Sequence, residues 1–172
     1  MSIKNYKLWI FAVIVVLVVI SYLNFYYNQK KEFKLITNDE ELASFMQNME
    51  EGDLEEYLAK KDELYAQDIY GGETPEETLT LFIDALKAGD VELASKYFKL
   101  EDQERELGEL AVLNSEQISN YILVLETRGE SSCSEVFGWC EIRGNYEEEE
   151  ILLNRFVKNN QTGKWKMESL QR

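Results

Sequence analysis

The longest uninterrupted run of hydrophobic positions lies near the start of the chain, from Leu8 to Tyr27. It reads LWIFAVIVVLVVISYLNFYY and contains no charged residue. At a rise of about 1.5 Å per residue, a helix of this length extends about 30 Å, the thickness of the hydrocarbon core of a bilayer. We therefore expect residues 8–27 to form a transmembrane helix that holds the rest of the chain at a membrane.

The flanks of this run favour a permanent anchor over a cleaved signal peptide. The run is longer than a usual signal core, and no cleavage site of small residues follows it. No cysteine lies close after it, which disfavours attachment as a lipoprotein. Aromatic residues gather at both ends, as they do at membrane interfaces: Tyr6, Trp9, Tyr22, Phe25, Tyr26 and Tyr27.

The orientation of the anchor is less strongly marked, because lysines flank it on both sides. These are Lys4, Lys7, Lys30, Lys31 and Lys34. A short leading tail more often stays in the cytoplasm while the long part of a chain is exported. We therefore expect residues 1–7 to be a cytoplasmic tail, residues 28–36 a juxtamembrane linker, and the C-terminal part to lie outside the cytoplasm.

Residues 37–71 carry the pattern of two amphipathic helices and form a predicted spacer. Thr37 and Glu40 have the spacing of a capping box, in which the two side chains satisfy free N–H groups at a helix start. Gly52 is expected to end this helix and Asp53 to cap the next one. The first helix has apolar residues on one face: Leu42, Phe45, Met46 and Met49.

The same pattern recurs 37 residues later, where Thr74 and Glu77 are spaced as a capping box and Gly89-Asp90 separates two more helices. Two units of a helical repeat are one interpretation. We favour the simpler one, that capped helix pairs resemble each other, because two units are too few to enclose a core. A further short helix is expected from Glu101 to Leu113.

Beyond these helices, four segments are rich in β-branched and aromatic residues and predict an antiparallel meander. They are residues 121–127, 135–143, 147–158 and 164–170. Gly144-Asn145 is expected to be a hairpin turn. Strict alternation in the last segment places Met167 on the buried face and Lys166 on the opposite, polar face. Residues 121–127 also fit a helical period, and a strand is the interpretation we prefer.

Together these elements predict an α+β protein. It would have an N-terminal transmembrane helix, a helical spacer, and then helices packed on a curved four-stranded antiparallel sheet in residues 72–172.

The net charge of −15 is distributed unevenly along the 172 residues. Residues 1–34 contain five lysines and one glutamate, a net charge of +4, so residues 35–172 carry −19. Such an acidic domain is repelled by nucleic acid and by anionic lipid, which excludes DNA and RNA as partners. A solvated surface is the simplest explanation for the charge, and a surface for cations or a basic partner is the alternative.

The chemistry-bearing residues match no catalytic, cofactor-binding or metal-binding motif. Histidine is absent, which removes the commonest general base and the commonest metal ligand. The acidic run from Glu147 to Glu150 lacks the glycine and alternating ligands of a calcium loop. Three aromatic residues lie on the predicted strands: Phe137, Trp139 and Trp165. We expect them in the core, and the alternative is that they line a pocket.

Two cysteines, Cys133 and Cys140, are the remaining chemical signal. On one extended strand they would lie about 23 Å apart, whereas bridged Cα atoms lie about 5.5 Å apart. A disulfide therefore requires residues 134–139 to form a tight hairpin of their own. The preferred interpretation is a small core residue at Cys140 and a loop thiol at Cys133, with the disulfide as the alternative.

Two stretches resemble a known superfamily. One runs from Thr74-Pro-Glu-Glu-Thr-Leu through Ala-Leu-Lys-Ala-Gly-Asp90 to Phe98, and the other is Asn160-Gln-Thr-Gly-Lys-Trp-Lys-Met167. Both are similar to the nuclear-transport-factor-2-like superfamily, and most to its uncharacterised bacterial branch of membrane-anchored proteins and lipoproteins. The resemblance covers residues 72–172 and implies a cone-shaped α+β domain with a pocket at its wide end. Isomerases and dehydratases of the superfamily use a pocket histidine and aspartate, and this chain has no histidine, so the resemblance carries over no catalytic role.

These observations favour a non-enzymatic accessory or binding module, tethered to the cell membrane through Leu8–Tyr27 with its domain outside the cytoplasm. No catalytic, cofactor or metal residue is assigned, and the ligand, the protein partner and a homodimer are left open. One alternative is an enzyme that uses carboxylates in the pocket of the cone. The other is a helical-repeat adaptor, which requires mostly helix beyond Ser115.

Overall fold

The computed structural model describes residues 13, 15–22, 33–134 and 136–169. It divides into two compact units, Met1–Lys34 and Leu35–Arg172. More than half of the predicted anchor, residues 8–27, lies outside the described residues. Among those that are described, residues 15–22 are helical, and no helix is both long enough and apolar enough to cross a membrane.

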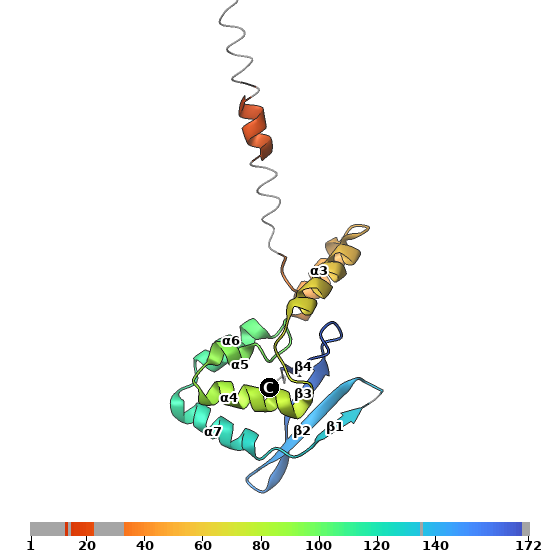
Figure 1. Ribbon diagram of the computed structural model, residues 1–172. Coiled ribbons are helices and arrows are strands. Elements are labelled where there is room, and N and C mark those ends of the chain that lie inside the picture. Colours follow the sequence, from red (N-terminus) through yellow and green to blue (C-terminus); the bar gives the residue numbers. More distant parts are fainter. Residues whose placement is uncertain (1–12, 14, 23–32, 135, 170–172) are drawn as a thin grey trace, which may run out of the picture. The chain divides into compact units, whose positions relative to one another are not determined.

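The second unit is α+β, as the sequence predicts (Figure 1). Its helices are α2 (Asp39–Asn48), α3 (Asp53–Gln67), α4 (Pro75–Lys87), α5 (Val91–Ser95), α6 (Gln103–Ala111) and α7 (Ser115–Glu126). Its strands are β1 (Ser131–Ser134), β2 (Trp139–Tyr146), β3 (Glu149–Lys158) and β4 (Trp165–Glu168).

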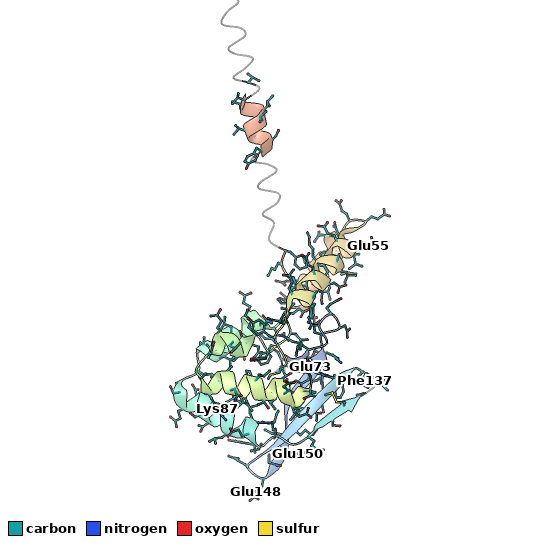
Figure 2. The ribbon with its side chains drawn as sticks, viewed as in Figure 1. Glu55, Glu73, Lys87, Phe137, Glu148 and Glu150 are labelled. Carbon is teal, nitrogen blue, oxygen red and sulfur yellow. A yellow bond between two sulfur atoms is a disulfide. The ribbon has the colours of Figure 1, made fainter. Side chains whose placement is uncertain are left out.

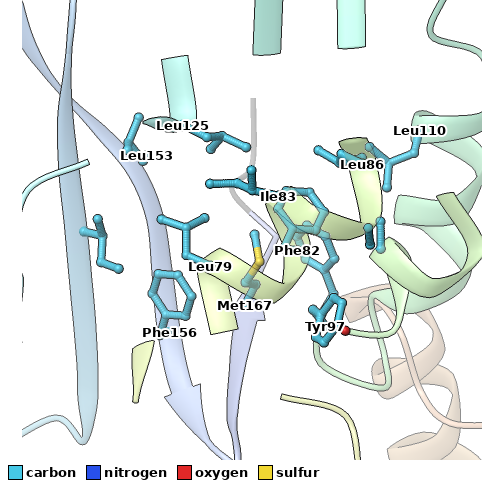
Figure 3. Packing of buried hydrophobic residues seen from close by; sticks show 14 of the residues in the cluster. Leu79, Phe82, Ile83, Leu86, Tyr97, Leu110, Leu125, Leu153, Phe156 and Met167 are labelled. Atoms are coloured by element: carbon cyan, nitrogen blue, oxygen red, sulfur yellow. The ribbon is translucent and has the colours of Figure 1, made fainter. Parts of the chain in front are cut away.

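The four strands form one antiparallel meander in the order β1-β2-β3-β4. Helices α4 and α7 pack against one face of this sheet, and α5 and α6 extend the helical layer beside α4 (Figure 1). The amphipathic pattern of α4 explains its central place, because Leu79, Phe82, Ile83 and Leu86 all fall on its buried face (Figure 3). Strand residues such as Phe156 and Met167 close the core from the other side.

The far edge of β4 is sealed by two segments that precede it in the sequence. Trp165 N donates to Gly72 O at 2.9 Å, and Met167 N donates to Tyr97 O at 2.8 Å. Lys99 N in turn donates to Met167 O at 2.9 Å. At the opposite edge, no strand of the described residues pairs with the outer side of β1.

The prediction of a strand at residues 121–127 is wrong, because residues 121–126 belong to helix α7 and Thr127 is its C-cap. A full capping box begins this helix: Gln117 N donates to Asn114 Oδ1 at 3.0 Å, and Asn114 N donates to Gln117 Oε1 at 2.9 Å. The apolar residues then follow the helical period and face the core. The fourth strand is β1, whose residues lie between the predicted segments 121–127 and 135–143.

Two further boundaries differ from the prediction. Gly144 and Asn145 lie inside β2, and the hairpin turn is made by Glu147 and Glu148. A Cβ atom at Gly144 would lie 2.5 Å from Thr127 Oγ1, so this glycine lets the end of α7 approach the strand.

The capping residue of α2 also differs, because it is Asn38 and not Thr37. The helix-repeat interpretation fails as well, since residues 131–168 contain four strands and not a continuing series of helices.

Candidate functional site

The structure joins Cys133 and Cys140 in a disulfide. The two residues face each other across β1 and β2, with Cα atoms 4.0 Å apart. The chain reverses between them at Gly138, whose φ is 69° and whose N–H donates to Ser134 O at 2.9 Å. This is the tight hairpin that a bridge between these cysteines requires.

The tip of this hairpin presents apolar side chains to solvent. Val136 is 86% exposed and Phe137 is 72% exposed. The rings of Phe137 and Trp139 stack with centroids 6.1 Å apart, and Figure 2 shows Phe137 at the end of the β1–β2 hairpin. We name Val136, Phe137 and Trp139 the aromatic tip.

The prediction that Phe137 and Trp139 belong to the core is therefore wrong, whereas Trp165 does pack against the core. Phe137 lies in the turn, beyond the last strand pair. Trp139 precedes the buried Cys140, and alternation along β2 places it on the opposite face of the sheet from the helices.

Arg155 links the aromatic tip to a charged row across the outer face of the sheet. Its guanidinium carbon lies 4.7 Å from the centre of the Trp139 ring, a cation–π contact. Arg155 Nη2 donates to Glu141 Oε1 at 3.1 Å, and Arg155 Nη1 lies 3.8 Å from Glu168 Oε2. Strand register pairs Glu141 with Arg155 and Arg155 with Glu168, so one arginine connects three strands.

This face has the residue types of a protein interface. Aromatic side chains and arginine carry much of the binding energy at such interfaces, whereas a small ligand needs a concave site. A stacked aromatic pair beside a half-buried arginine, on a hairpin closed by a disulfide, therefore suits recognition of another protein surface.

A separate groove of about 580 Å³ runs between the end of α4 and the first half of α7. It is lined mainly by apolar residues: Leu86, Lys87, Ala88, Gly89, Ser115, Ile118, Ser119, Ile122 and Leu123. Lys87 at its edge is paired with Glu126 at 2.6 Å. The Ser119 hydroxyl donates to Ser115 O at 2.8 Å, so its proton already has an acceptor within the helix. The groove suits an apolar group and lacks a convergent set of polar groups.

The buried carboxylate of Asp68 pairs with Lys166 at 2.7 Å. Lys166 also donates to Lys96 O at 2.6 Å and to Tyr70 O at 3.2 Å, so two backbone carbonyls hold the ammonium beside the ion pair. Desolvation lowers the pKa of Lys166. The pair ties β4 to the chain after α3 and to the end of α5, and neither residue lines the groove.

The expectation that Lys166 lies on a polar, solvent-facing side of β4 is wrong, because Lys166 is only 1% exposed. The strand alternates as predicted, with Met167 in the core, but the chain around Asp68 and Tyr70 covers the other face of β4.

Within the described part of the chain, no group of three or more acidic or cysteine side chains is arranged to hold a metal ion. Comparisons with protein-family models, with curated proteins and with solved structures found no match. The resemblance to the nuclear-transport-factor-2-like superfamily therefore stays a prediction.

Proposed function

We propose that this protein is a membrane-tethered binding module whose domain lies outside the cytoplasm and recognises a protein partner through the aromatic tip. The observation that carries the proposal is the disulfide between Cys133 and Cys140, which closes a hairpin with Phe137 exposed at its end. The proposed anchor is the apolar run of residues 8–27, and the module has no assigned catalytic role.

The disulfide supports the proposed compartment. Disulfides persist in oxidising compartments and are rare in the cytosol of most cells, where thiol-based reductants keep cysteines reduced. A pair of cysteines on neighbouring strands, bridged beside the surface of the domain, therefore favours an exported domain. An uncleaved anchor with a short cytoplasmic tail gives that location.

The shape of the tip supports a protein as the partner. An exposed aromatic side chain loses apolar contact with water when a partner covers it, which stabilises the complex. Closure by a disulfide reduces the conformational freedom that the hairpin would lose on binding. The acid-flanked Arg155 beside the tip adds a directional group that fixes the orientation of the partner.

The superfamily resemblance agrees with this proposal, since helices followed by an antiparallel meander is the order that it implies. The competing enzyme hypothesis relies on a carboxylate in a polar cleft. The buried carboxylate of Asp68 is paired with Lys166 instead, and the groove between α4 and α7 is mainly apolar; the carboxylate in the smaller polar pocket beside Tyr65, Asp62, lies on an exposed position of α3. Turnover of any substrate by the purified domain, lost on mutation of a carboxylate, would overturn the non-enzymatic part of the proposal.

Site-specific photocrosslinking of the full-length chain in living cells tests the partner. A photoreactive residue at Val136 is expected to give a discrete adduct with another protein, and Phe137→Ser is expected to remove it. Val112 is a matched control, because it is 80% exposed and lies at the end of α6. Equal adducts from Val136 and Val112, or an adduct that persists in Phe137→Ser, would contradict the proposal.

A further inference from the structure

Helices α2 and α3 carry an apolar stripe that no described residue buries. Neither helix contains a buried residue, and in Figure 1 α3 extends away from α4–α7 and the sheet. Five side chains with exposures between 37% and 51% make up the stripe: Leu42, Met46, Met49, Leu54 and Leu58. We name these five residues the hairpin stripe.

The stripe lies on a hairpin whose base is fixed. The Phe45 and Tyr57 rings, 5.2 Å apart, connect α2 to α3. The last turn of α3 is held to the domain by two contacts of Tyr65: its hydroxyl donates to Glu101, and its carbonyl accepts from Asn159 Nδ2 at 2.8 Å. The end of α3 is thus held to the domain and a ring contact joins α2 to α3, while the five apolar side chains stay partly exposed.

Helices of this length are marginal in water unless an apolar face is packed. Helix α2 has ten residues and α3 has fifteen. An uncovered stripe along both helices therefore indicates a surface that gains stability when something covers it.

The charge around the hairpin stripe indicates which kind of partner could cover it. Residues 37–67 contain ten acidic residues and two lysines, a net charge of −8. The remaining residues 68–172 carry −11 over more than three times the length, so acidity is concentrated on this hairpin. Figure 2 shows one of these acids, Glu55, on α3.

A second copy of the chain is a poor occupant, because two hairpins of charge −8 repel each other. A bilayer is also a poor partner for the stripe. Helices that lie on membranes carry basic residues on their polar face, whereas this hairpin carries acidic residues. A basic amphipathic helix complements both features: its apolar face matches the stripe and its basic residues match the acidic rim.

We propose that the hairpin stripe is a docking site for a basic amphipathic helix of a partner protein. Two of its five residues are methionines, whose unbranched and polarisable side chains adapt to different apolar surfaces. The site lies on elements other than the aromatic tip, so it does not rest on the function proposed above.

A direct binding experiment uses the full-length chain in neutral detergent and a fluorescent peptide of leucine and lysine, about 18 residues or five helical turns long. The peptide is designed to form an amphipathic helix. We expect saturable binding by fluorescence anisotropy, weakened as salt rises from about 0.1 M to about 1 M. A scrambled peptide of the same composition, with no apolar face, is expected to bind about tenfold more weakly.

Matched variants locate the site on the hairpin. Leu42→Gln with Met46→Gln removes two stripe residues while keeping good helix formers, and is expected to weaken binding about tenfold. Ala43→Gln with Ser44→Gln places two glutamines elsewhere on α2 and is expected to leave binding unchanged. Circular dichroism checks that both variants keep the helical content of the original chain.

Three outcomes would overturn the inference. In one, the scrambled peptide binds as tightly as the amphipathic peptide, so that only charge is recognised. In another, the stripe variant binds as well as its control. In the third, sedimentation shows that the chain is a dimer, the stripe variant is a monomer and neither binds peptide, which would assign the stripe to contact between copies.

Discussion

Two adjacent glutamates hold backbone conformations that are unfavourable for their side chains. Glu147 has a φ of 51° and Glu148 a φ of 69°, and together they turn the chain between Tyr146 and Glu149. Two-residue hairpin turns with positive φ at both positions favour Asn followed by Gly. Figure 2 shows Glu148 at this turn, away from the end of the hairpin that carries Phe137.

Replacing Glu147→Asn and Glu148→Gly is therefore expected to raise the free energy of unfolding by about 1 kcal/mol. Urea denaturation followed by circular dichroism measures this change. Glu150→Asn, which removes a nearby exposed charge within β3, serves as the control and is expected to give less than half the effect. An equal gain from Glu150→Asn would show that charge and not backbone conformation is responsible.

The buried pair of Lys166 and Asp68 predicts a strongly asymmetric response to mutation. Lys166→Met leaves the Asp68 carboxylate buried without its partner, and this is expected to cost about 3–5 kcal/mol of stability. Adding Asp68→Asn removes the unpaired charge and is expected to recover part of the loss. Lys164→Met, at a partly exposed position two residues earlier, should change stability far less than Lys166→Met.

A double-mutant cycle on Lys166 and Asp68 measures the coupling between the two side chains. If the two single substitutions are mild and strictly additive, the pair does not hold β4 to the chain around Asp68 as inferred.

Glu106 predicts a pH-dependent effect, because burial raises the pKa of its carboxyl from the ordinary 4.5. The folded chain binds this proton more tightly than the unfolded chain, so the contribution of Glu106 to the stability of the fold is greatest when its carboxyl is protonated. Its contribution falls as pH rises above 4.5 through the raised pKa of the folded state. Ser169 Oγ donates to this carboxyl, and an amide oxygen can accept the same bond.

Glu106→Gln is therefore expected to be close to neutral for stability below both pKa values and to stabilise the chain at neutral pH. Thermal melts across this pH range measure the difference. Glu104→Gln, on the same helix, controls for the general relief of repulsion in a chain of charge −15. A gain from Glu106→Gln that is independent of pH, or equal to that of the control, would contradict the role assigned to burial.

At the scale of elements, the sequence predicts best where periodicity and capping agree. Helix α4 follows the prediction because Thr74 caps it and its apolar residues fall on one face. The prediction of a strand in α7 is wrong because its β-branched and aromatic residues are also typical of strands. Its capping box between Asn114 and Gln117 is present in the sequence and was the signal that distinguishes the two.

Strand β1 shows the limit of local prediction. Its sequence, Ser131–Ser134, has no apolar alternation, and its pairing with β2 depends on a turn and on the disulfide at Cys133. The aromatic tip follows from that pairing, so a prediction that makes residues 135–143 one strand cannot give its exposure. Contacts such as that of Asp68 with Lys166 join segments far apart in the sequence, so the residues next to each of them give no indication of the pairing.

The disulfide is expected to stabilise the domain mainly by limiting the unfolded chain. For a loop of this length the chain-entropy estimate is about 2.5 kcal/mol. Cys133→Ser with Cys140→Ser is expected to lower the free energy of unfolding by about this amount, as is addition of reductant to the original chain. If reductant lowers the stability of the double variant equally, the loss does not come from this disulfide.

At the scale of the whole molecule, the proposed topology predicts how the cysteines respond in intact cells. A membrane-impermeant maleimide should label the full-length chain from outside only after reductant opens the disulfide. Denatured, lysed cells give the maximum signal and exclude burial as the cause of weak labelling. Labelling that appears only after lysis, with or without reductant, would place the domain in the cytoplasm.

The sealed edge of β4 also limits how copies of this protein can associate through their sheets. A fibre needs two open edges per molecule, because each copy must accept a neighbour on one side and offer a strand on the other. Here Gly72, Tyr97 and Lys99 already occupy bonding groups of β4, so the edge of the sheet that β4 forms is closed to a neighbouring copy. Pairing through the outer side of β1 can therefore join two copies into one continuous sheet, whereas the closed edge of β4 cannot add a further copy.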